Sequence, residues 1–381
     1  MIAFYCQTQP ISGYGRWSLR WAEAHLKHNE NPVGTAISHS TIQRILKQHN
    51  LKPHLTKYFL QITDPDFFWK MHRLLPLYFN PPEHYYCFDE CPGIQILQRL
   101  APDLQTDEMK IRLEEFEYIR GGTIDVLAFL HVKSGKIIAD CYADHKIETF
   151  LLFFEKHLKT LPDDKNIYYT MDNLSSHVCY KLCKIVAKYS SIDCPAEDQL
   201  NTMKKRREWL QLEGKRIMFY FTPFHGSWLN MVEIWFGILN QKCLKESYDS
   251  AESIFESISS FIEKWNEYLA HPFTWNYDGA GLEQKVVHRF TKMLEFSIDK
   301  MNTQFMTKQF MLMINLKKKY DKKIELSTWN KLCFMIEANY KKINNSIQNI
   351  KGPRVKKKAK KALQGIVKVF KLQIPKNLCT E

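Results

Sequence analysis

The chain has 381 residues, of which 45% are hydrophobic and 13% aromatic, so it can bury a large core and wholesale disorder is excluded. No apolar run reaches the roughly eighteen residues that a membrane-spanning helix needs, and the first ten residues lack the features of a secretory leader. The ten cysteines are scattered and form no CxxC pair, which argues against a zinc site and favours reduced thiols in the cytoplasm.

The formal net charge of +13 is unevenly distributed along the chain. Residues 283–381 contain 23 Lys and Arg against 7 Asp and Glu, so this segment carries +16 and residues 1–282 carry −3. A smaller basic excess lies before residue 80. Basic ends that flank an acidic centre are typical of a nucleic-acid enzyme that holds phosphates at its edges.

Two helices are predicted near the N-terminus. The first spans Arg16–Lys27, with Trp17, Trp21 and Ala24 on one face, and the second starts at Ser38 and runs to about residue 48. The outer surface of the second helix carries Ser40, Gln43, Arg44 and Lys47. This layout is that of a helix-turn-helix, whose second helix offers such side chains to the major groove of DNA, although a solvated helical pair has the same pattern. Leu51–His54 is interpreted as a linker, and Asp64–Tyr78 as a connecting helix.

Two short aromatic runs each end in an acid. Residues 85–88, YYCF, precede Asp89, and residues 167–171, IYYTM, precede Asp172. Runs of this composition are typical of buried strands. An acid at the carboxyl end of a central strand faces the crevice where open α/β sheets bind ligands.

A third acid, Glu233, lies on a helix predicted to begin near Ser227, whose hydroxyl is suited to cap the first turn. The apolar stripe of this helix consists of Leu229, Val232, Phe236 and Leu239. A carboxylate on so apolar a helix is costly to bury without a cation, although a Glu at the edge of the stripe is the plain alternative. Two Asp and one Glu could supply the hard oxygens that magnesium or manganese needs for phosphodiester chemistry.

Several motifs resemble the mariner-like transposases of bacterial insertion sequences, which belong to the DDE superfamily. They are YYCFDE at 85, YIRGGTIDVLAFLHVKSGKII at 118, YTMDNLSSH at 169, FTPFHGSWLNMVEIWFGIL at 221 and HPFTW at 271. The resemblance extends from about Trp17 to Leu282, and Ser227–Glu233 is its most specific part. It implies an α/β fold in which an RNase H-like catalytic domain, a mixed five-stranded sheet flanked by helices, follows an N-terminal helix-turn-helix.

The resemblance also implies the chemistry. Asp89, Asp172 and Glu233 would be the catalytic triad and would hold two Mg²⁺ or Mn²⁺ ions. The enzyme would be a DNA transposase and endonuclease. It would cleave double-stranded DNA at the terminal inverted repeats of its element and join the 3′-hydroxyl to target DNA, at TA. A homodimer in the DNA complex and a place in the bacterial cytoplasm, with the nucleoid, are expected. An RNase H-fold nuclease without strand transfer and an inactive DNA-binding relic remain as rivals.

The expected domains are 1–60 for the helix-turn-helix region, 61–82 for the linker helix, 83–282 for the catalytic domain and 283–381 for a basic helical tail. Met1 enters the pattern midway, so a shortened N-terminus is expected. The 61-position interval between Asp172 and Glu233 is long for the family, and residues 191–216 are interpreted as an insertion.

Two histidines near the acids are candidate DNA contacts. His177 follows the second Asp, and His225 precedes the helix of Glu233. A structural cap is the alternative role for His177. In the tail, helices are expected over 290–316 and 326–350, docked on the catalytic domain, and residues 351–381 are expected to be looser.

Overall fold

The structure, a computed structural model, describes residues 17–27, 35–49, 61–106 and 111–374. The chain divides into two compact units, residues 1–60 and residues 61–381, and each is described by itself. The start of the chain, on which the expected shortening depends, and the expected linker at 51–54 lie outside the described residues. Within the described residues, no helix has the length and apolarity to cross a membrane.

Two short helices lie in the described residues of the first unit, α2 (Leu19–Leu26) and α3 (His39–Gln48). The hydroxyls of Ser18 and Ser38 accept hydrogen bonds from the first turn of α2 and α3, as N-cap residues do. The helices pack through a small core made of Trp17, Ala22, Leu26, Ile42 and Leu46. The buried face of α2 is therefore that of Ala22 and Leu26, and the expected partners Trp21 and Ala24 are only partly buried.

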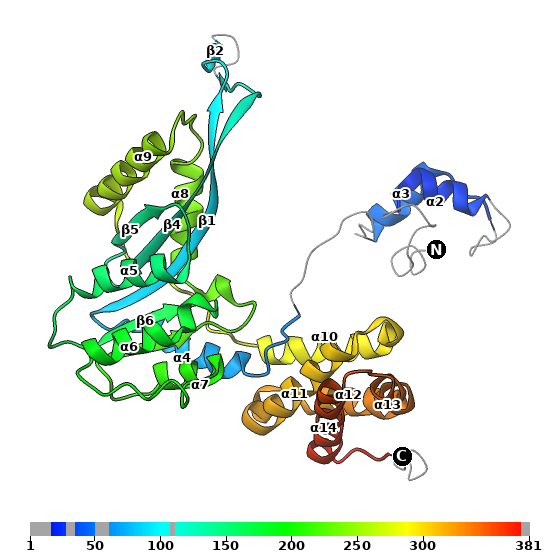
Figure 1. Cartoon of the computed structure of the whole chain (residues 1–381). Coiled ribbons are helices and arrows are strands. Elements are labelled where there is room, and N and C mark those ends of the chain that lie inside the picture. Colours follow the sequence, from blue (N-terminus) through cyan, green and yellow to red (C-terminus); the bar gives the residue numbers. More distant parts are fainter. Residues whose placement is uncertain (1–16, 28–34, 50–60, 107–110, 375–381) are drawn as a thin grey trace. The chain divides into compact units, whose positions relative to one another are not determined.

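The second unit is organised around a five-stranded sheet (Figure 1). Its strands are β1 (Tyr85–Arg99), β4 (Tyr118–His131), β5 (Ile137–Tyr142), β6 (Ile167–Met171) and β7 (Ile217–Phe221). The strand order is β5-β4-β1-β6-β7; β4 pairs antiparallel with β1 and β5, whereas β6 pairs parallel with β1 and β7. The mixed sheet that the sequence indicated is confirmed.

Strand β1 is longer than expected, because it continues past Asp89 for ten residues. The register with β4 shifts between Cys91 and Ile94, where Pro92 has no N–H to donate and Gly93 adopts a φ of +70°. Beyond this bulge β1 and β4 run on as a two-stranded ribbon, whose end carries β2 (Leu104–Thr106) and β3 (Ile111–Leu113) (Figure 1). The sequence motifs gave no sign of this second, small sheet.

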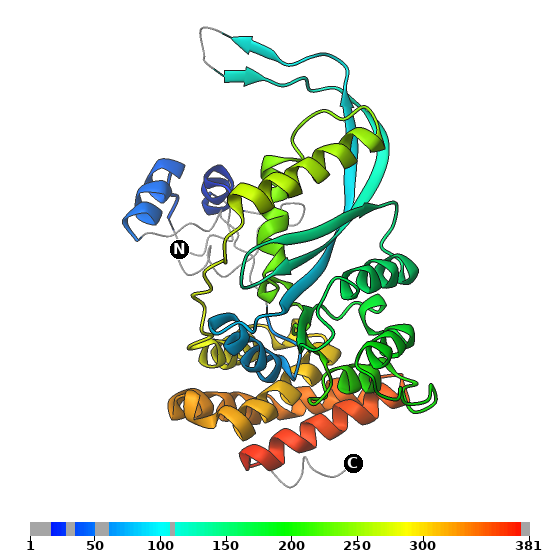
Figure 2. The same cartoon turned by 90° about the vertical axis from the view of Figure 1, so that its left-hand side faces the viewer.

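Helices cover both faces of the sheet, and alternate residues of the strands supply the two cores. One face packs on α5 (Ile147–Leu158), α6 (Tyr180–Tyr189) and α7 (Met203–Leu210) (Figure 2). The other packs on α4 (Phe67–Phe79), α8 (Val232–Lys242) and α9 (Ala251–Lys264), which continues as a π-helix over Trp265–Leu269. The segment interpreted as an insertion, 191–216, contains α7, and its Leu200, Trp209 and Leu210 are buried in the first core.

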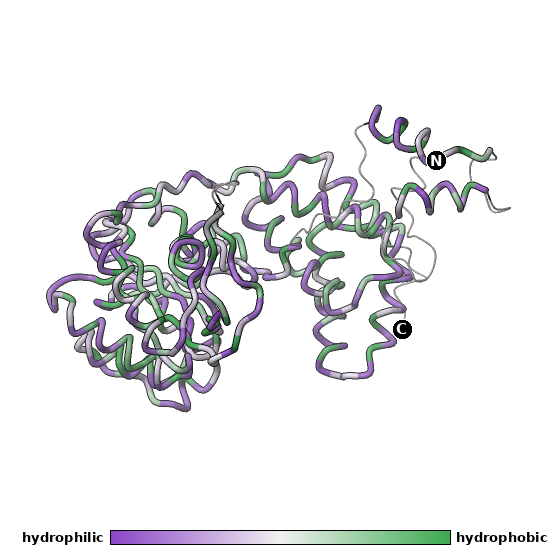
Figure 3. The backbone as a smooth tube through the Cα atoms, turned by 90° about the horizontal axis from the view of Figure 1, so that it is seen from above, coloured by the Kyte–Doolittle hydropathy of each residue, from purple (hydrophilic) through white to green (hydrophobic). Residues whose placement is uncertain are grey.

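In the described residues after α9 and its π-helix there are five α-helices: α10 (Leu282–Phe296), α11 (Thr303–Tyr320), α12 (Leu326–Ala338), α13 (Tyr340–Gln348) and α14 (Pro353–Phe370). Hydrophobic and hydrophilic residues alternate along these helices (Figure 3). Two expectations are corrected here. Residues 290–316 belong to two helices, broken at Ser297–Asn302, and residues 351–370 are not loose, because the apolar face of α14 packs on α11 and α13.

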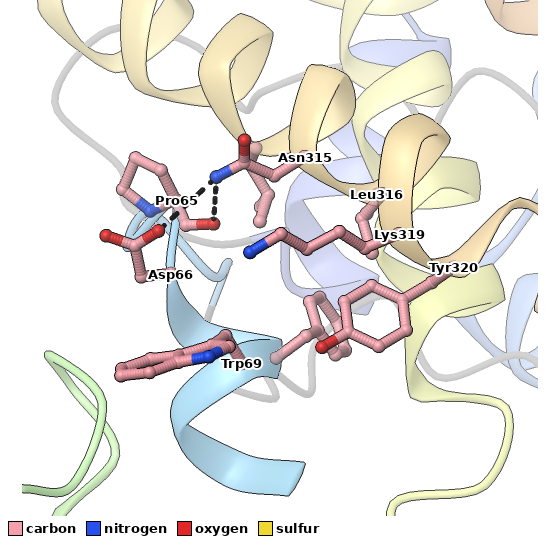
Figure 4. A pocket seen from close by; sticks show the side chains of 9 residues that line it. Pro65, Asp66, Trp69, Asn315, Leu316, Lys319 and Tyr320 are labelled. Atoms are coloured by element: carbon pink, nitrogen blue, oxygen red, sulfur yellow. Dashed lines mark hydrogen bonds between the residues drawn. The ribbon is translucent and has the colours of Figure 1, made fainter. Parts of the chain in front are cut away.

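The tail is joined by polar contacts to residues 61–65, which directly precede α4, as well as by apolar packing. Gln309 of α11 donates to the carbonyl of Ile62 (2.6 Å) and accepts from Gln61 (3.0 Å). Asn315 donates to the carbonyl of Pro65 at 2.9 Å, beside a small pocket between α4 and α11 (Figure 4). The same apolar cluster contains residues of α4, α8 and α11, so the tail helices share the core of the sheet.

Candidate active site

The site lies where the parallel pairing of β1 and β6 ends. The last parallel pair is Cys87 with Thr170, and Asp172 directly follows the last residue of β6. Asp89 lies two residues beyond Cys87, where β1 is paired with β4 alone. Asp89 was predicted to lie at the end of its strand, but it lies inside β1. Because β1 and β6 are no longer paired beyond Cys87, Asp89 nevertheless lies at the same edge of the sheet as Asp172.

Strand alternation directs Asp89 toward the α8 face of the sheet. There Asn230, which is fully buried, donates its amide to the Asp89 carboxylate (Oδ2, 3.0 Å) and to the carbonyl of Phe88 (2.8 Å). Burial raises the pKa of Asp89 well above its usual range, and the negative charges of Asp172, Glu90 and Glu233 raise it further. Asp89 therefore lies within the electrostatic reach of both other predicted acids.

Glu233 occupies the first turn of α8 and is exposed. The protein around the Glu233 carboxylate partly removes it from water, which raises the pKa of Glu233, and the charges of Asp172 and Glu90 raise this pKa further. The predicted cap by Ser227 is wrong: Ser227–Leu229 forms a separate 3₁₀ turn, and neither that turn nor α8 has a side-chain cap. Asn230 lies between the 3₁₀ turn and α8 and leaves the helical conformation, with a ψ of 113°. This is the residue whose amide contacts Asp89.

His177 lies between two acids on the opposite side of the sheet edge. Its Nδ1 is 2.6 Å from Oδ1 of Asp172, and its Nε2 is 3.0 Å from Oε2 of Glu90. Burial opposes the charged imidazolium, but the hydrogen bonds and charges of Asp172 and Glu90 raise the pKa of His177 to about 10. Burial also opposes the charge of Asp172, yet His177 and the N–H of Leu174 hold the pKa of Asp172 below its ordinary value.

The ion pairs of His177 with Asp172 and Glu90 should make the stability of the fold depend on pH. A histidine pKa of about 10 in the folded state, against about 6.5 in the unfolded chain, stabilises the fold in full below pH ~6.5. The contribution is lost as the pH rises toward 10. We expect His177→Gln to lose on the order of 3 kcal/mol at neutral pH, since it leaves carboxylates unpaired. The melting-temperature gap to the wild type should narrow between pH 7 and 10.

The matched control is His288→Gln, which changes an exposed histidine of α10. Its melting temperature should follow the wild type at every pH. A gap for His177→Gln that stays constant up to pH 10 would contradict the pairing of a charged His177 with Asp172 and Glu90.

The donor set fits a divalent cation, because it consists of carboxylate oxygens, and the negative charges of neighbouring acids raise the pKa of Asp89 and of Glu233. Among the described residues, no three His, Cys, Asp or Glu side chains are already grouped tightly enough to hold one ion. Carboxylates that no cation neutralises repel one another, which keeps their side chains apart. A bound cation would offset this repulsion and allow them to approach. Asp89, Asp172 and Glu233 are therefore candidates for metal ligands.

The other predicted site residues are placed as follows. His225 is exposed, with a φ of +59°, in the loop between β7 and α8, whereas the buried position of His177 favours its structural role. The four side chains predicted to face DNA are exposed on α3: Ser40, Gln43, Arg44 and Lys47. Sequence reasoning missed Glu90 and Asn230. The Asp-Glu pair at 89–90 was a signal for Glu90, since neighbouring strand residues face opposite sides of the sheet.

Residues 86–254 match the family described as DDE superfamily endonuclease. Among solved structures, the Mos1 strand transfer complex aligns with a TM-score of 0.40 at 10% identity, over 68% of this chain and 73% of that chain. The Mos1 transposase paired-end complex with the left transposon end gives 0.40 at 11% identity, over 70% and 76%. No curated protein matches the sequence significantly. The segment that matches this family, residues 86–254, contains all but the first residue of β1, the other six strands and α8, and with them Asp89, Asp172 and Glu233.

Proposed function

We propose that this protein is a DNA transposase whose Asp89, Asp172 and Glu233 cut and rejoin phosphodiester bonds. The observation that carries the proposal is that Asp89 in β1, Asp172 directly after β6 and Glu233 in α8 are close enough for their charges to interact, in a segment that matches the DDE superfamily endonucleases. Their order along the chain and the motifs around them resemble those of the mariner-like transposases. The nuclease without strand transfer and the inactive relic are the alternatives that experiment must separate.

The three carboxylates would hold two Mg²⁺ or Mn²⁺ ions. Such ions activate the attacking oxygen and stabilise the leaving oxygen of an in-line displacement. Asn230 holds one Asp89 oxygen by a hydrogen bond and so fixes the direction of the carboxylate. His177 holds Oδ1 of Asp172 and neutralises Glu90, which leaves Glu233 as the exposed and adjustable member of the set.

The exposed face of α3 would read the terminal inverted repeats of the element in the major groove. We expect Gln43→Ala and Arg44→Ala to weaken binding to the end sequence more than binding to random duplex. Base-edge contacts carry discrimination of about 1–3 kcal/mol each, whereas backbone contacts carry none. Fluorescence anisotropy with both duplexes measures this difference. Gln48→Ala, at the last position of the same helix, is the control, and an equal loss on both duplexes would defeat the assignment of α3.

The test of the function uses the full chain and a duplex that ends in the inverted repeat of the element. With Mg²⁺ or Mn²⁺, the protein should release the end and join its 3′-hydroxyl to a second duplex that contains TA. Cleavage without joined product would favour the simple nuclease. Binding without cleavage would favour the relic. Because a transposase must bring two ends together, we also expect a homodimer on paired ends, which light scattering of the DNA complex would detect.

A further inference from the structure

The last helix of the chain, α14, carries two stripes with the same spacing. Ala359, Ala362, Leu363 and Ile366 are buried, and their spacing of i, i+3, i+4 and i+7 makes one face of a helix. Arg354, Lys357, Lys358 and Lys361 repeat that spacing five residues earlier. Five residues correspond to about 500°, so the basic stripe lies about 140° away from the buried one. All four of its side chains are exposed.

Packing fixes this basic stripe in place. The buried stripe contacts α11 and α13, and Lys356 donates to the carbonyl of Gln348 at 2.7 Å. The start of α14 is also favourable, because Pro353 occupies the first turn, where its missing N–H has no helical partner to lose. The four cations are therefore held on a rigid helix, spread over about 10 Å of its length at 1.5 Å per residue.

The positive charge of the stripe is not neutralised by the protein itself. No Asp or Glu occurs between Glu337 and Glu381. In the described part of the chain, none of these four side chains forms an ion pair with a carboxylate, unlike Lys342, which pairs with Asp299. Arg354 with Lys358, and Lys357 with Lys361, are like charges at i, i+4, a spacing at which repulsion between the two side chains destabilises a helix. A bound polyanion would remove this repulsion.

The surface beside α14 is hollowed on two sides by basic grooves. One groove is lined by Gln304, Thr307, Lys308, Arg354, Val355 and Lys358, so it joins α14 to the start of α11. The other is lined by Pro353, Lys356, Lys357, Lys360, Lys361 and Gln364. Both contain lysines and no acid. A membrane surface is a poorer partner than a polyanion, because the apolar face that would enter lipid is already buried.

We propose that α14 is an anchor for the phosphate backbone of duplex DNA, independent of sequence and separate from the catalytic acids. Duplex DNA offers about one negative charge per 1.7 Å, which a compact stripe of four cations can match. The stripe has no base-reading pattern of amides and carboxylates, so it would hold DNA without choosing it. The inference rests on the proposed function for the choice of DNA as the polyanion.

The experiment compares two triple variants of the full chain, each checked for folding by circular dichroism. One replaces Lys357, Lys358 and Lys361 with Gln, which has a helix propensity close to that of Lys. The matched control replaces Lys285, Lys292 and Lys300 with Gln; these are exposed lysines of α10 and of the turn that follows it. Binding to a random duplex is measured by anisotropy across a salt series.

Each lost phosphate contact should flatten the log–log salt dependence by about 0.9, so the α14 variant should lose about two to three units of slope. The α10 control should keep the wild-type slope, and Lys→Arg at the three α14 positions should restore it. Equal slopes in the α14 variant and the control would overturn the proposal. If the Gln variant failed to fold, acylation footprinting of wild-type lysines would decide, because bound duplex must protect Lys357, Lys358 and Lys361.

The outcome is separable from that of the proposed function. A protein that shows the slope change but neither prefers nor cuts any transposon end would keep the anchor and lose the transposase. A protein that cuts and joins ends while its α14 variant keeps the full slope would keep the transposase and lose the anchor.

Discussion

Glu233→Gln should fold and bind DNA like the wild type but should not cut it. Glu233 is exposed in the first turn of α8, so an amide of the same shape leaves the packing of that helix unchanged. The substitution removes one of the negative charges that raise the pKa of Asp89, and with it one of the three proposed metal ligands. Cleavage of an end-containing duplex with Mg²⁺ or Mn²⁺ should fall below detection, and cleavage at the wild-type rate would defeat the mechanism.

A second measurement on the same variant does not depend on activity. A cation that binds the folded state stabilises it by mass action, so Mn²⁺ should raise the melting temperature of the wild type. Glu233→Gln should respond less. Without metal, the variant should be at least as stable as the wild type, because repulsion among Asp89, Asp172 and Glu233 is reduced. Glu256→Gln, on the exposed side of α9, is the control, and it should cut DNA and respond to Mn²⁺ normally.

The sequence predicted those parts of the site that depend on local pattern. The aromatic runs before Asp89 and Asp172 became strands, and Leu229, Val232, Phe236 and Leu239 are all buried as the stripe requires. Asn230 was not predicted, because its contact with Asp89 joins residues 141 positions apart. No local pattern indicates that Asn230 would leave the helical conformation and move the start of α8 from Ser227 to Val232.

The tail shows a different limit of sequence reasoning. The apolar spacing of Ala359, Ala362, Leu363 and Ile366 was present in the sequence, but residues 351–381 were expected to be looser than the helices before them. The contact of α14 with α11 stabilises this lysine-rich helix, and the local composition of the sequence alone did not indicate that contact. Tertiary packing also determines what the tail does for the rest of the protein.

Removal of residues 283–381 should therefore disrupt the fold, not merely weaken DNA binding. The deletion would take away Phe290, Phe310 and Leu316, which are buried in the same cluster as Phe67 and Met71 of α4. It would also leave Gln61 and the carbonyl of Ile62 without Gln309. Loss of a single buried Phe costs about 3–5 kcal/mol, and a whole domain is stable by only about 5–15 kcal/mol.

The truncated chain 1–282 should accordingly be insoluble, or should lack a cooperative thermal transition in circular dichroism. Full-length Phe310→Ala is the graded version of this test, and it should fold but melt at a lower temperature. The Lys285, Lys292 and Lys300 triple variant removes tail charge without touching the core, so it should melt like the wild type. Chain 1–282 could instead unfold cooperatively near the wild-type temperature and differ only in a flatter salt dependence of DNA binding. In that case the tail acts through charge alone, and the shared core between α4 and α11 contributes nothing to stability.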